Sequence, residues 1–161
     1  MTTKKLSRLA IFIALSFVLS TVIVFPNMAP AQHMMNVVGA MVLGPVYNAI
    51  AAFVSGLFRM ALSGRAFIAT SGWVGALLSG LVYKHTKNIL WTGLSEVVGS
   101  GILSAFVYYF PMKFIYGLDL PNAGYYIPFF LPSALVGAII GVLVLACLLY
   151  TSPSPRDKRQ S

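Results

Sequence analysis

Acidic residues are almost absent from this sequence of 161 residues, which contains only Glu96, Asp119 and Asp157 against eleven lysines and arginines. Charged residues make up 9% of the chain and hydrophobic residues 58%, whereas soluble domains are typically about a quarter charged. So few charges cannot cover a surface that faces water, which excludes an ordinary soluble domain. The composition therefore predicts an integral membrane protein embedded in the lipid bilayer.

Cysteine and histidine are also scarce. The single cysteine, Cys147, lies in an apolar run, and the two histidines are His33 and His85. One cysteine excludes an intrachain disulfide and a cysteine metal cluster. The sequence also lacks a glycine-rich phosphate loop and any arrangement that resembles a hydrolase triad. We expect no enzymatic activity, no cofactor and no metal site, so any ATP hydrolysis must belong to another protein.

The basic residues are present in small groups between apolar runs. They do not form one stripe, so they indicate membrane topology anchors rather than a nucleic-acid site. The first group, Lys4, Lys5 and Arg8, lies at the start of the apolar run 6–25. This run is longer than a signal-peptide core and has no small-residue cleavage site before Pro26. We therefore expect residues 6–25 to form the first membrane helix.

The number of membrane helices depends on one Gly-Pro pair. A membrane helix needs about 20 apolar residues, and Gly44-Pro45 interrupts the apolar run 34–58. Proline removes a backbone hydrogen bond and clashes with the preceding turn. Either one kinked helix or two helices with a tight turn at residues 44–48 would fit. The distribution of basic residues mildly favours five spans in total, whereas the Gly-Pro pair favours six.

Small residues recur at a spacing of four. Such a spacing lets helix backbones approach closely, which is how helices associate inside membranes. Packing within the chain is the simpler interpretation of each pair, but an exposed pair would suit a helix of a partner protein. The pairs and triplets are Ala10 and Ala14, then Gly72, Ala76 and Gly80, and finally Gly137 and Gly141.

Four polar residues are candidates for ligand contacts. Gln32, His33 and Asn36 cluster where the chain enters its second helix. Such side chains suit a small polar heterocycle, although they could equally cap the helix. Glu96 lies within the apolar run 89–110, where a carboxyl group usually faces a cavity or a partner. It would contact the ligand, join helices by hydrogen bonds, or lie neutral near the interface.

Two aromatic residues are ambiguous. Trp73 and Tyr108 lie near the ends of apolar runs, where aromatic rings usually anchor a helix at the membrane interface. The alternative is that they stack against an aromatic ligand and form the wall of its pocket.

Five stretches of the sequence resemble a known family. They are Ala10-Ile-Phe-Ile-Ala14, Gln32-His-Met-Met-Asn-Val37, Leu43-Gly-Pro-Val-Tyr47, Gly75-Ala-Leu-Leu-Ser-Gly-Leu-Val-Tyr-Lys84 and Glu96-Val-Val-Gly-Ser-Gly-Ile102. Their order is similar to the S components of energy-coupling factor (ECF) vitamin transporters, most closely the ThiW family. The likeness covers residues 4–146, and its more specific parts are Gln-His-Met and Leu-Gly-Pro-x-Tyr.

The resemblance implies an all-α integral membrane protein, a six-transmembrane-helix bundle in a single domain over residues 1–150. It resolves the choice between five and six spans toward six. The protein is expected to cross the cell membrane several times, with both termini in the cytoplasm. The expected spans are residues 6–25, 34–43, 46–62, 66–83, 89–110 and 127–148.

The resemblance also implies partners and a ligand. The Ala10 and Ala14 face would dock on the T component, and separate A subunits would hydrolyse ATP. The expected ligand is hydroxyethylthiazole, with hydroxymethylpyrimidine or thiamine as alternatives. Apart from the resemblance, the alternative function is a self-sufficient small secondary transporter. The substrate-binding candidates are Gln32, His33, Asn36, Trp73, Glu96 and Tyr108.

Two stretches depart from the family pattern. Residues 63–73 do not follow the family pattern, because Arg65 and Trp73 stand where small or aliphatic residues are expected. The polar tail 151–161 resembles a translated sequencing-adapter read-through that begins near Cys147. It has no part in the functional argument.

Overall fold

The structure is a computed structural model that describes residues 2–25 and 29–151. Apart from Thr151, the polar tail 151–161 lies outside the described residues. The regular elements are helices and follow one another in chain order. They are α1 (Thr3–Val22), α2 (Pro30–Val42), α3 (Pro45–Ser63), the 3₁₀ helix η1 (Phe67–Thr70), α4 (Trp73–Thr86), α5 (Ile89–Val98), the π-helical η2 (Gly99–Leu103), α6 (Ser104–Phe114) and α7 (Ile127–Thr151).

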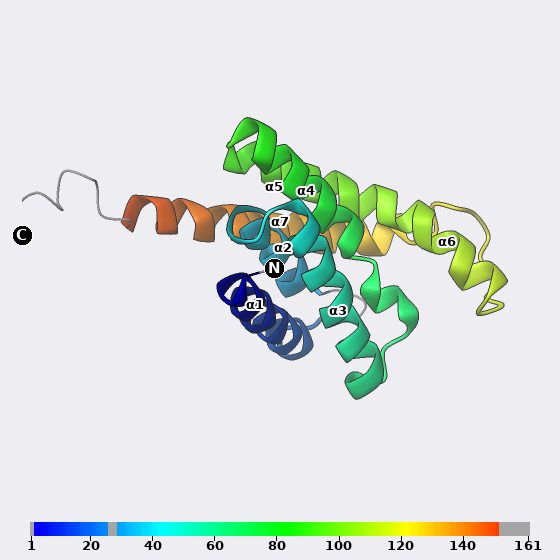
Figure 1. Cartoon of the computed structure of the whole chain (residues 1–161). Coiled ribbons are helices and arrows are strands. Elements are labelled where there is room, and N and C mark those ends of the chain that lie inside the picture. The colour runs from blue at the N-terminus through cyan, green and yellow to red at the C-terminus, as the bar shows by residue number, and fades with distance from the viewer. Residues whose placement is uncertain (1, 26–28, 152–161) are drawn as a thin grey trace, which may run out of the picture.

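The bundle contains six α-helices within the described residues, because α5, η2 and α6 continue as one long helix, Ile89–Phe114. Successive helices alternate in direction and pack around α2 (Figure 1). Four of the six are long and apolar enough to cross a membrane: α1, α3, Ile89–Phe114 and α7. The other two, α2 and α4, have only 13 and 14 residues. The expectation of an all-α six-helix bundle is confirmed.

The Gly44-Pro45 pair forms a tight turn between two helices. Gly44 has a φ of 78°, a left-handed conformation that favours glycine over other residues. Pro45 then occupies the first turn of α3, where its missing N–H is not needed. The interruption seen in the sequence is therefore a helix–turn–helix junction rather than a kink.

The short helix α2 lies at the centre of the bundle. Nine of its 13 residues are buried, and α7 packs directly against it. A Cβ atom at Gly137 would collide with the carbonyl oxygen of Pro30, and one at Gly141 would lie 2.8 Å from Cβ of Val37. These two glycines serve packing within the chain, because only glycine permits this approach of the helices.

The long helix Ile89–Phe114 turns a polar stripe toward the interior. Thr92, Glu96, Ser100 and Ser104 are all buried. The π-helical segment widens the helix between them, and the hydroxyl of Ser104 donates to the carbonyl oxygen of Gly99 at 3.1 Å. π-helical turns are often found at functional sites. Here the segment lies beside the polar centre of the bundle.

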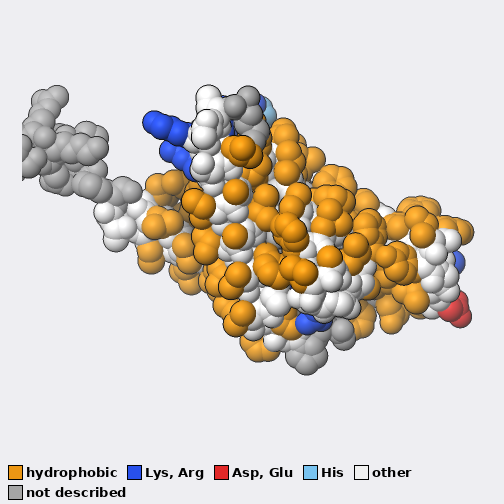
Figure 2. Space-filling view, turned by 60° about the horizontal axis from the view of Figure 1, so that its bottom comes forward, with side chains coloured by type: hydrophobic (Ala, Val, Ile, Leu, Met, Phe, Trp, Pro, Cys, Tyr) orange, Lys and Arg blue, Asp and Glu red, His pale blue; other side chains and the backbone are white. Residues whose placement is uncertain are grey.

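The outer surface is largely apolar. Hydrophobic side chains cover the body of the molecule in Figure 2, with lysines and arginines near the edges of the view. Ile11 is 62% exposed and Leu143 is 60% exposed. Such a surface would be unfavourable in water and suits contact with lipid.

The observed helix bounds differ from the expected spans at several ends. α2 begins at Pro30 rather than 34, and α6 continues through Pro111 to Phe114. The largest difference is the expected span 66–83, because α4 begins only at Trp73. Residues 67–70 form η1 instead, and buried Thr70 packs against Gly56 of α3. These residues are apolar because they pack back onto the bundle.

Candidate ligand-binding site

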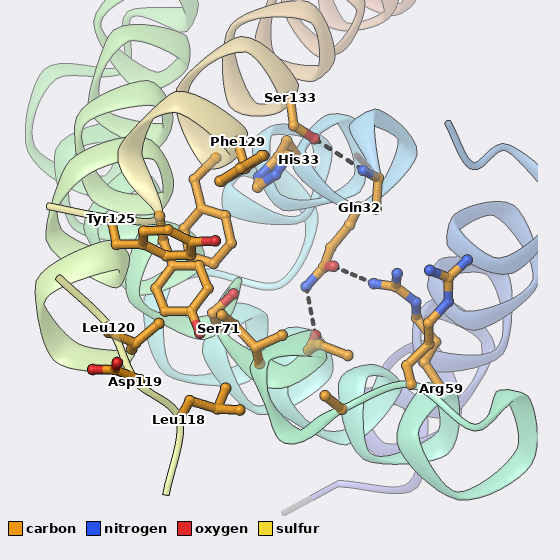
Figure 3. A pocket seen from close by; sticks show the side chains of 17 residues that line it. Gln32, His33, Arg59, Ser71, Leu118, Asp119, Leu120, Tyr125, Phe129 and Ser133 are labelled. Carbon is orange, nitrogen blue, oxygen red and sulfur yellow. Dashed lines mark hydrogen bonds between the residues drawn. The ribbon is translucent and has the colours of Figure 1, made fainter. Parts of the chain in front are cut away.

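A cavity of about 550 Å³ opens at the end of the bundle where α2 and α7 begin and α3 ends. This volume lies within the range typical of small-molecule sites, roughly 300 to 1,000 Å³. The cavity is lined by the beginnings of α2 and α7, the end of α3, and the loops 64–72 and 115–126. In Figure 3, Tyr125 and Phe129 lie on one side of it, and Gln32 and Arg59 lie on the other.

The aromatic side of the cavity comes from residues 125–130. The rings of Tyr126 and Phe130 are stacked with centroids 5.6 Å apart, and those of Tyr125 and Phe129 are 5.8 Å apart. Burial raises the pKa of the Tyr126 hydroxyl, with a smaller contribution from Tyr125. The phenol therefore stays neutral at physiological pH and can donate a hydrogen bond. These rings offer a flat apolar surface with polar tips.

Gln32 lies on the opposite side, in the first turn of α2. Its Nε2 donates to the carbonyl oxygen of Ala69 at 3.4 Å, and its Oε1 accepts from Nη1 of Arg59. The preceding backbone N–H of Ala29 donates to the hydroxyl of Ser133 in α7 at 3.0 Å. These contacts hold the beginning of α2 against three other segments (Figure 3).

His33 joins the cavity to a buried carboxyl group. Glu96 is 0% exposed, and its Oε1 accepts from Nδ2 of Asn36 at 2.8 Å and from the hydroxyl of Ser100 at 2.7 Å. Nδ1 of His33 lies 3.0 Å from the same oxygen. Because that oxygen already accepts two hydrogen bonds, we assign the Nδ1 proton to His33. The ring is then held with Nε2 as the nitrogen left for a ligand, since His33 lines the cavity.

Two asparagines extend this network across the bundle. Asn36 also donates to the carbonyl oxygen of Gly72 at 3.0 Å. Asn48 donates to the carbonyl oxygens of Asn36 at 2.8 Å and Ala76 at 2.9 Å. The network thus joins α2, α3, α4 and the long helix through buried polar groups. Within the described structure two oxygens of the network, Oδ1 of Asn48 and Oε2 of Glu96, have no partner.

The six binding residues predicted from the sequence fall into two groups, those that line the cavity and those that do not. Gln32 and His33 line the cavity, whereas Asn36 and Glu96 lie behind its wall. Trp73 and Tyr108 are also outside the lining.

Tyr108 has a different partner. It is 3% exposed, its hydroxyl lies 2.6 Å from Oγ1 of Thr70, and its ring lies 5.5 Å from that of Phe67. Tyr108 therefore holds η1 against the long helix Ile89–Phe114. Trp73 begins α4 and is half-buried.

Sequence reasoning missed Arg59, Asn48 and the aromatic wall. Arg59 was interpreted only as a topology anchor, although it is 5% exposed and lines the cavity. Its place within an apolar helix was the available signal. Tyr125 and Tyr126 have the same ambiguity in the sequence as Trp73 and Tyr108, between an anchor at the membrane interface and the wall of a ligand pocket. Their rings pair with those of Phe129 and Phe130, four residues further on, across the start of α7 at Ile127, where the last span was expected to begin.

A second hollow lies on the outer face of α1 and α3. Ala10 and Ala14 are exposed there and line an apolar groove together with Phe17, Phe58 and Leu62. Among the described residues, no three histidine, cysteine or acidic side chains gather as a metal site.

Comparison with known proteins identifies the family. A family model described as thiamine-precursor transporter protein (ThiW) matches residues 6–151. No curated protein matches the chain. A solved structure, of the S component of a bacterial ECF transporter, has a TM-score of 0.73 and 20% identity, covering 93% of this chain and 98% of the other.

The match to that structure confirms the S-component fold, and the family match confirms a transporter rather than an enzyme. The family model covers nearly the whole chain. The chain therefore belongs to the ThiW family, the thiamine-precursor transporters, and is a multi-pass membrane protein.

Proposed function

We propose that the chain is the substrate-binding S component of an ECF-type ABC importer, and that its cavity binds hydroxyethylthiazole. The observation that carries the ligand proposal is the arrangement around His33. The ring is oriented by the buried carboxyl group of Glu96 and faces a cavity with an aromatic wall. A pocket built this way suits a small flat heterocycle.

The chemistry of a thiazole alcohol matches this cavity. Nε2 of His33, with Nδ1 protonated, is an acceptor for the hydroxyl proton of the ligand. The ring nitrogen of a thiazole needs a donor, which the hydroxyl of Tyr126 or the guanidinium group of Arg59 offers. The rings of residues 125–130 would stack on the flat face.

The test of the site is a pair of alanine substitutions in the purified protein. His33→Ala should weaken hydroxyethylthiazole binding about five- to a hundred-fold, since a lost hydrogen-bond partner costs about 1 to 3 kcal/mol. Asn36→Ala should also weaken binding, through the Glu96 network. Calorimetric titration in detergent measures both, and hydroxymethylpyrimidine and thiamine are titrated alongside.

The control is His85→Ala. His85 is exposed at the opposite end of the bundle, so its removal should leave binding unchanged. If His33→Ala binds the thiazole as tightly as the parent, the ligand site lies elsewhere.

We further propose that the groove at Ala10 and Ala14 receives a helix of the T component, with ATP hydrolysed by A subunits. Two exposed small residues on an apolar helix face support a close helix–helix contact. The alternative, a self-sufficient secondary transporter, predicts uptake by cells that contain no T or A component.

A further inference from the structure

We propose that the ligand of the cavity carries a phosphate group, bound by Arg59 and Arg65, so that the preferred substrate is a phosphate monoester of the thiazole alcohol. The inference rests on the proposed thiazole site for the organic part of the ligand. The anionic part is argued separately, from the charges that line the cavity.

Arg59 is a buried cation without an acidic partner. Its side chain is 5% exposed, and its hydrogen-bond partner among the described residues is the neutral amide of Gln32. Within the described part of the chain, no acidic side chain forms an ion pair with Arg59, and the buried carboxyl group of Glu96 contacts His33 instead. Buried charges are normally paired, because desolvation without a counter-charge is costly. A buried arginine without an acidic partner indicates that a bound ligand supplies the negative charge that neutralises it.

Arg59 lines the cavity and has donors beyond the nitrogen that contacts Gln32. A guanidinium group has five N–H donors, and the contact with Gln32 accounts for one nitrogen, Nη1. Because the side chain lines the cavity, its other donors are available to a bound molecule. Figure 3 shows Arg59 beside Gln32, on the side opposite Tyr125. A ligand stacked on the aromatic wall could therefore extend a polar group toward Arg59.

Arg65 adds a second positive charge to the same cavity. It is exposed in the loop after α3, lines the cavity with Arg59, and acts on Arg59 as a like charge. Asp119 is the only acidic residue in the lining, and it forms no ion pair among the described residues. Two like charges brought together are unfavourable unless an anion lies between them. The lining therefore has an excess of positive charge.

The position of these arginines is unusual for topology anchors. Helix directions place Arg59, Arg65 and Lys113 at one end of the bundle. At the opposite end are five other basic residues, on α1, on α4 and directly after α4: Lys4, Lys5, Arg8, Lys84 and Lys87. The positive-inside rule concentrates lysines and arginines at the cytoplasmic end. Arg59 and Arg65 lie together in one cavity, at the end of the bundle with fewer basic residues. Ligand binding explains this position better than membrane orientation does.

A phosphate monoester fits two guanidinium groups better than the other thiamine-related ligands do. It carries close to two negative charges at neutral pH and has three acceptor oxygens. Thiamine carries a permanent positive charge on its thiazolium ring, which the arginines would repel. The neutral thiazole alcohol would bind but would leave the charge of Arg59 uncompensated.

The first experiment compares hydroxyethylthiazole with its phosphate ester by calorimetric titration of the detergent-purified protein. The ester should bind at least about tenfold more tightly, as charge-assisted hydrogen bonds imply. Arg65→Gln, at an exposed position in the loop after α3, should reduce the ratio of the two affinities about tenfold. Arg59→Gln should reduce it further. Arg8→Gln, an exposed arginine on α1, should leave the ratio unchanged.

Equal or weaker binding of the phosphate ester by the parent protein would overturn the inference. Preservation of the parent ratio in both Arg59→Gln and Arg65→Gln would overturn it as well. The same results would leave the proposed thiazole site intact if the alcohol binds.

A second experiment tests the anion site without the thiazole. Inorganic phosphate should raise the thermal unfolding temperature of the parent, relative to chloride at equal ionic strength, and should not raise that of Arg65→Gln. If neither thiazole compound binds but phosphate shows this arginine dependence, the proposed ligand is wrong and the anion site stands. If phosphate gives no arginine-dependent shift, the anion site is refuted.

Discussion

At the scale of single residues, Glu96 organises the polar centre of the bundle. One of its oxygens accepts hydrogen bonds from Asn36, Ser100 and His33, whereas the other, Oε2, has no partner in the described structure. A Cβ atom at Gly75 would lie 2.7 Å from Oε2. The carboxyl group is thus enclosed on the α4 side and hydrogen-bonded to α2 on the other, so we expect it to position His33 rather than to touch the ligand.

Removal of this carboxyl group should destabilise the protein. Glu96→Ala leaves three buried donors without their acceptor, at about 1 kcal/mol or more each, so the free energy of unfolding should fall by about 3 kcal/mol. Thermal unfolding in detergent, followed by circular dichroism, measures the loss. Glu96→Gln keeps one acceptor oxygen and should lose less.

Asp119→Ala is the control for this prediction, because Asp119 is exposed and its loss should not change the unfolding temperature. An unfolding temperature of Glu96→Ala equal to that of the parent would show that the network contributes nothing to stability.

The sequence predicted individual site residues better than it predicted their partners. Gln32, His33 and Glu96 stood out because polar side chains are rare in this chain. Their division into cavity lining and supporting network depends on which helices meet, over a separation of 63 residues for His33 and Glu96. Periodicity within one helix holds no information about that contact.

At the scale of elements, the small residues of α1 differ from those of α7. Gly137 and Gly141 are buried against α2, but Ala10 and Ala14 remain exposed in a groove. The sequence gives both pairs the same spacing, so it could not distinguish internal packing from a surface for a partner. The structure makes the distinction, because it shows that no helix of the described chain covers the α1 pair.

Ala14→Trp should abolish uptake while leaving ligand affinity nearly unchanged. A large ring in the groove would keep a partner helix from approaching closely, whereas the cavity is lined by other elements. Uptake of radiolabelled substrate in cells with the complete transporter, together with titration of the purified protein, measures both quantities.

Leu15→Trp is the matched control, since Leu15 is exposed on α1 outside the groove. It should preserve uptake. Parallel loss of uptake and affinity in Ala14→Trp would indicate a structural defect, and normal uptake would place the docking surface elsewhere.

The turn at Gly44-Pro45 was more predictable than the start of α4. Gly44-Pro45 specifies a junction through a left-handed glycine and a proline at the first helical position, and both follow from residue type alone. The segment 66–72 was predicted as helix because hydropathy does not distinguish an apolar helix from an apolar loop packed on α3. Tertiary contacts around Thr70 decide the outcome there.

At the scale of the whole molecule, the cavity lies at the opposite end of the bundle from the start of α1 and the end of α7. The helix order places these two helix ends, the Gly44 turn and the loop 87–88 at one end, and the cavity with its loops at the other. Of the basic residues in the described part of the chain, five are at the end that holds the start of α1, and three are at the cavity end. The positive-inside rule, applied to six helices, therefore favours cytoplasmic termini and an external cavity.

Cysteine labelling in intact cells tests this orientation. In a Cys147→Ser background, which has no other cysteine, a cysteine at Asn122 in the exposed cavity loop should react with a membrane-impermeant maleimide. A cysteine at Val46, 61% exposed beside the Gly44 turn, should react only after the membrane is opened. The two sites serve as controls for each other, because both are exposed and differ in the end of the bundle they occupy. Labelling of Val46→Cys alone from outside would invert the topology and place the cavity in the cytoplasm, where it could not capture an external vitamin precursor.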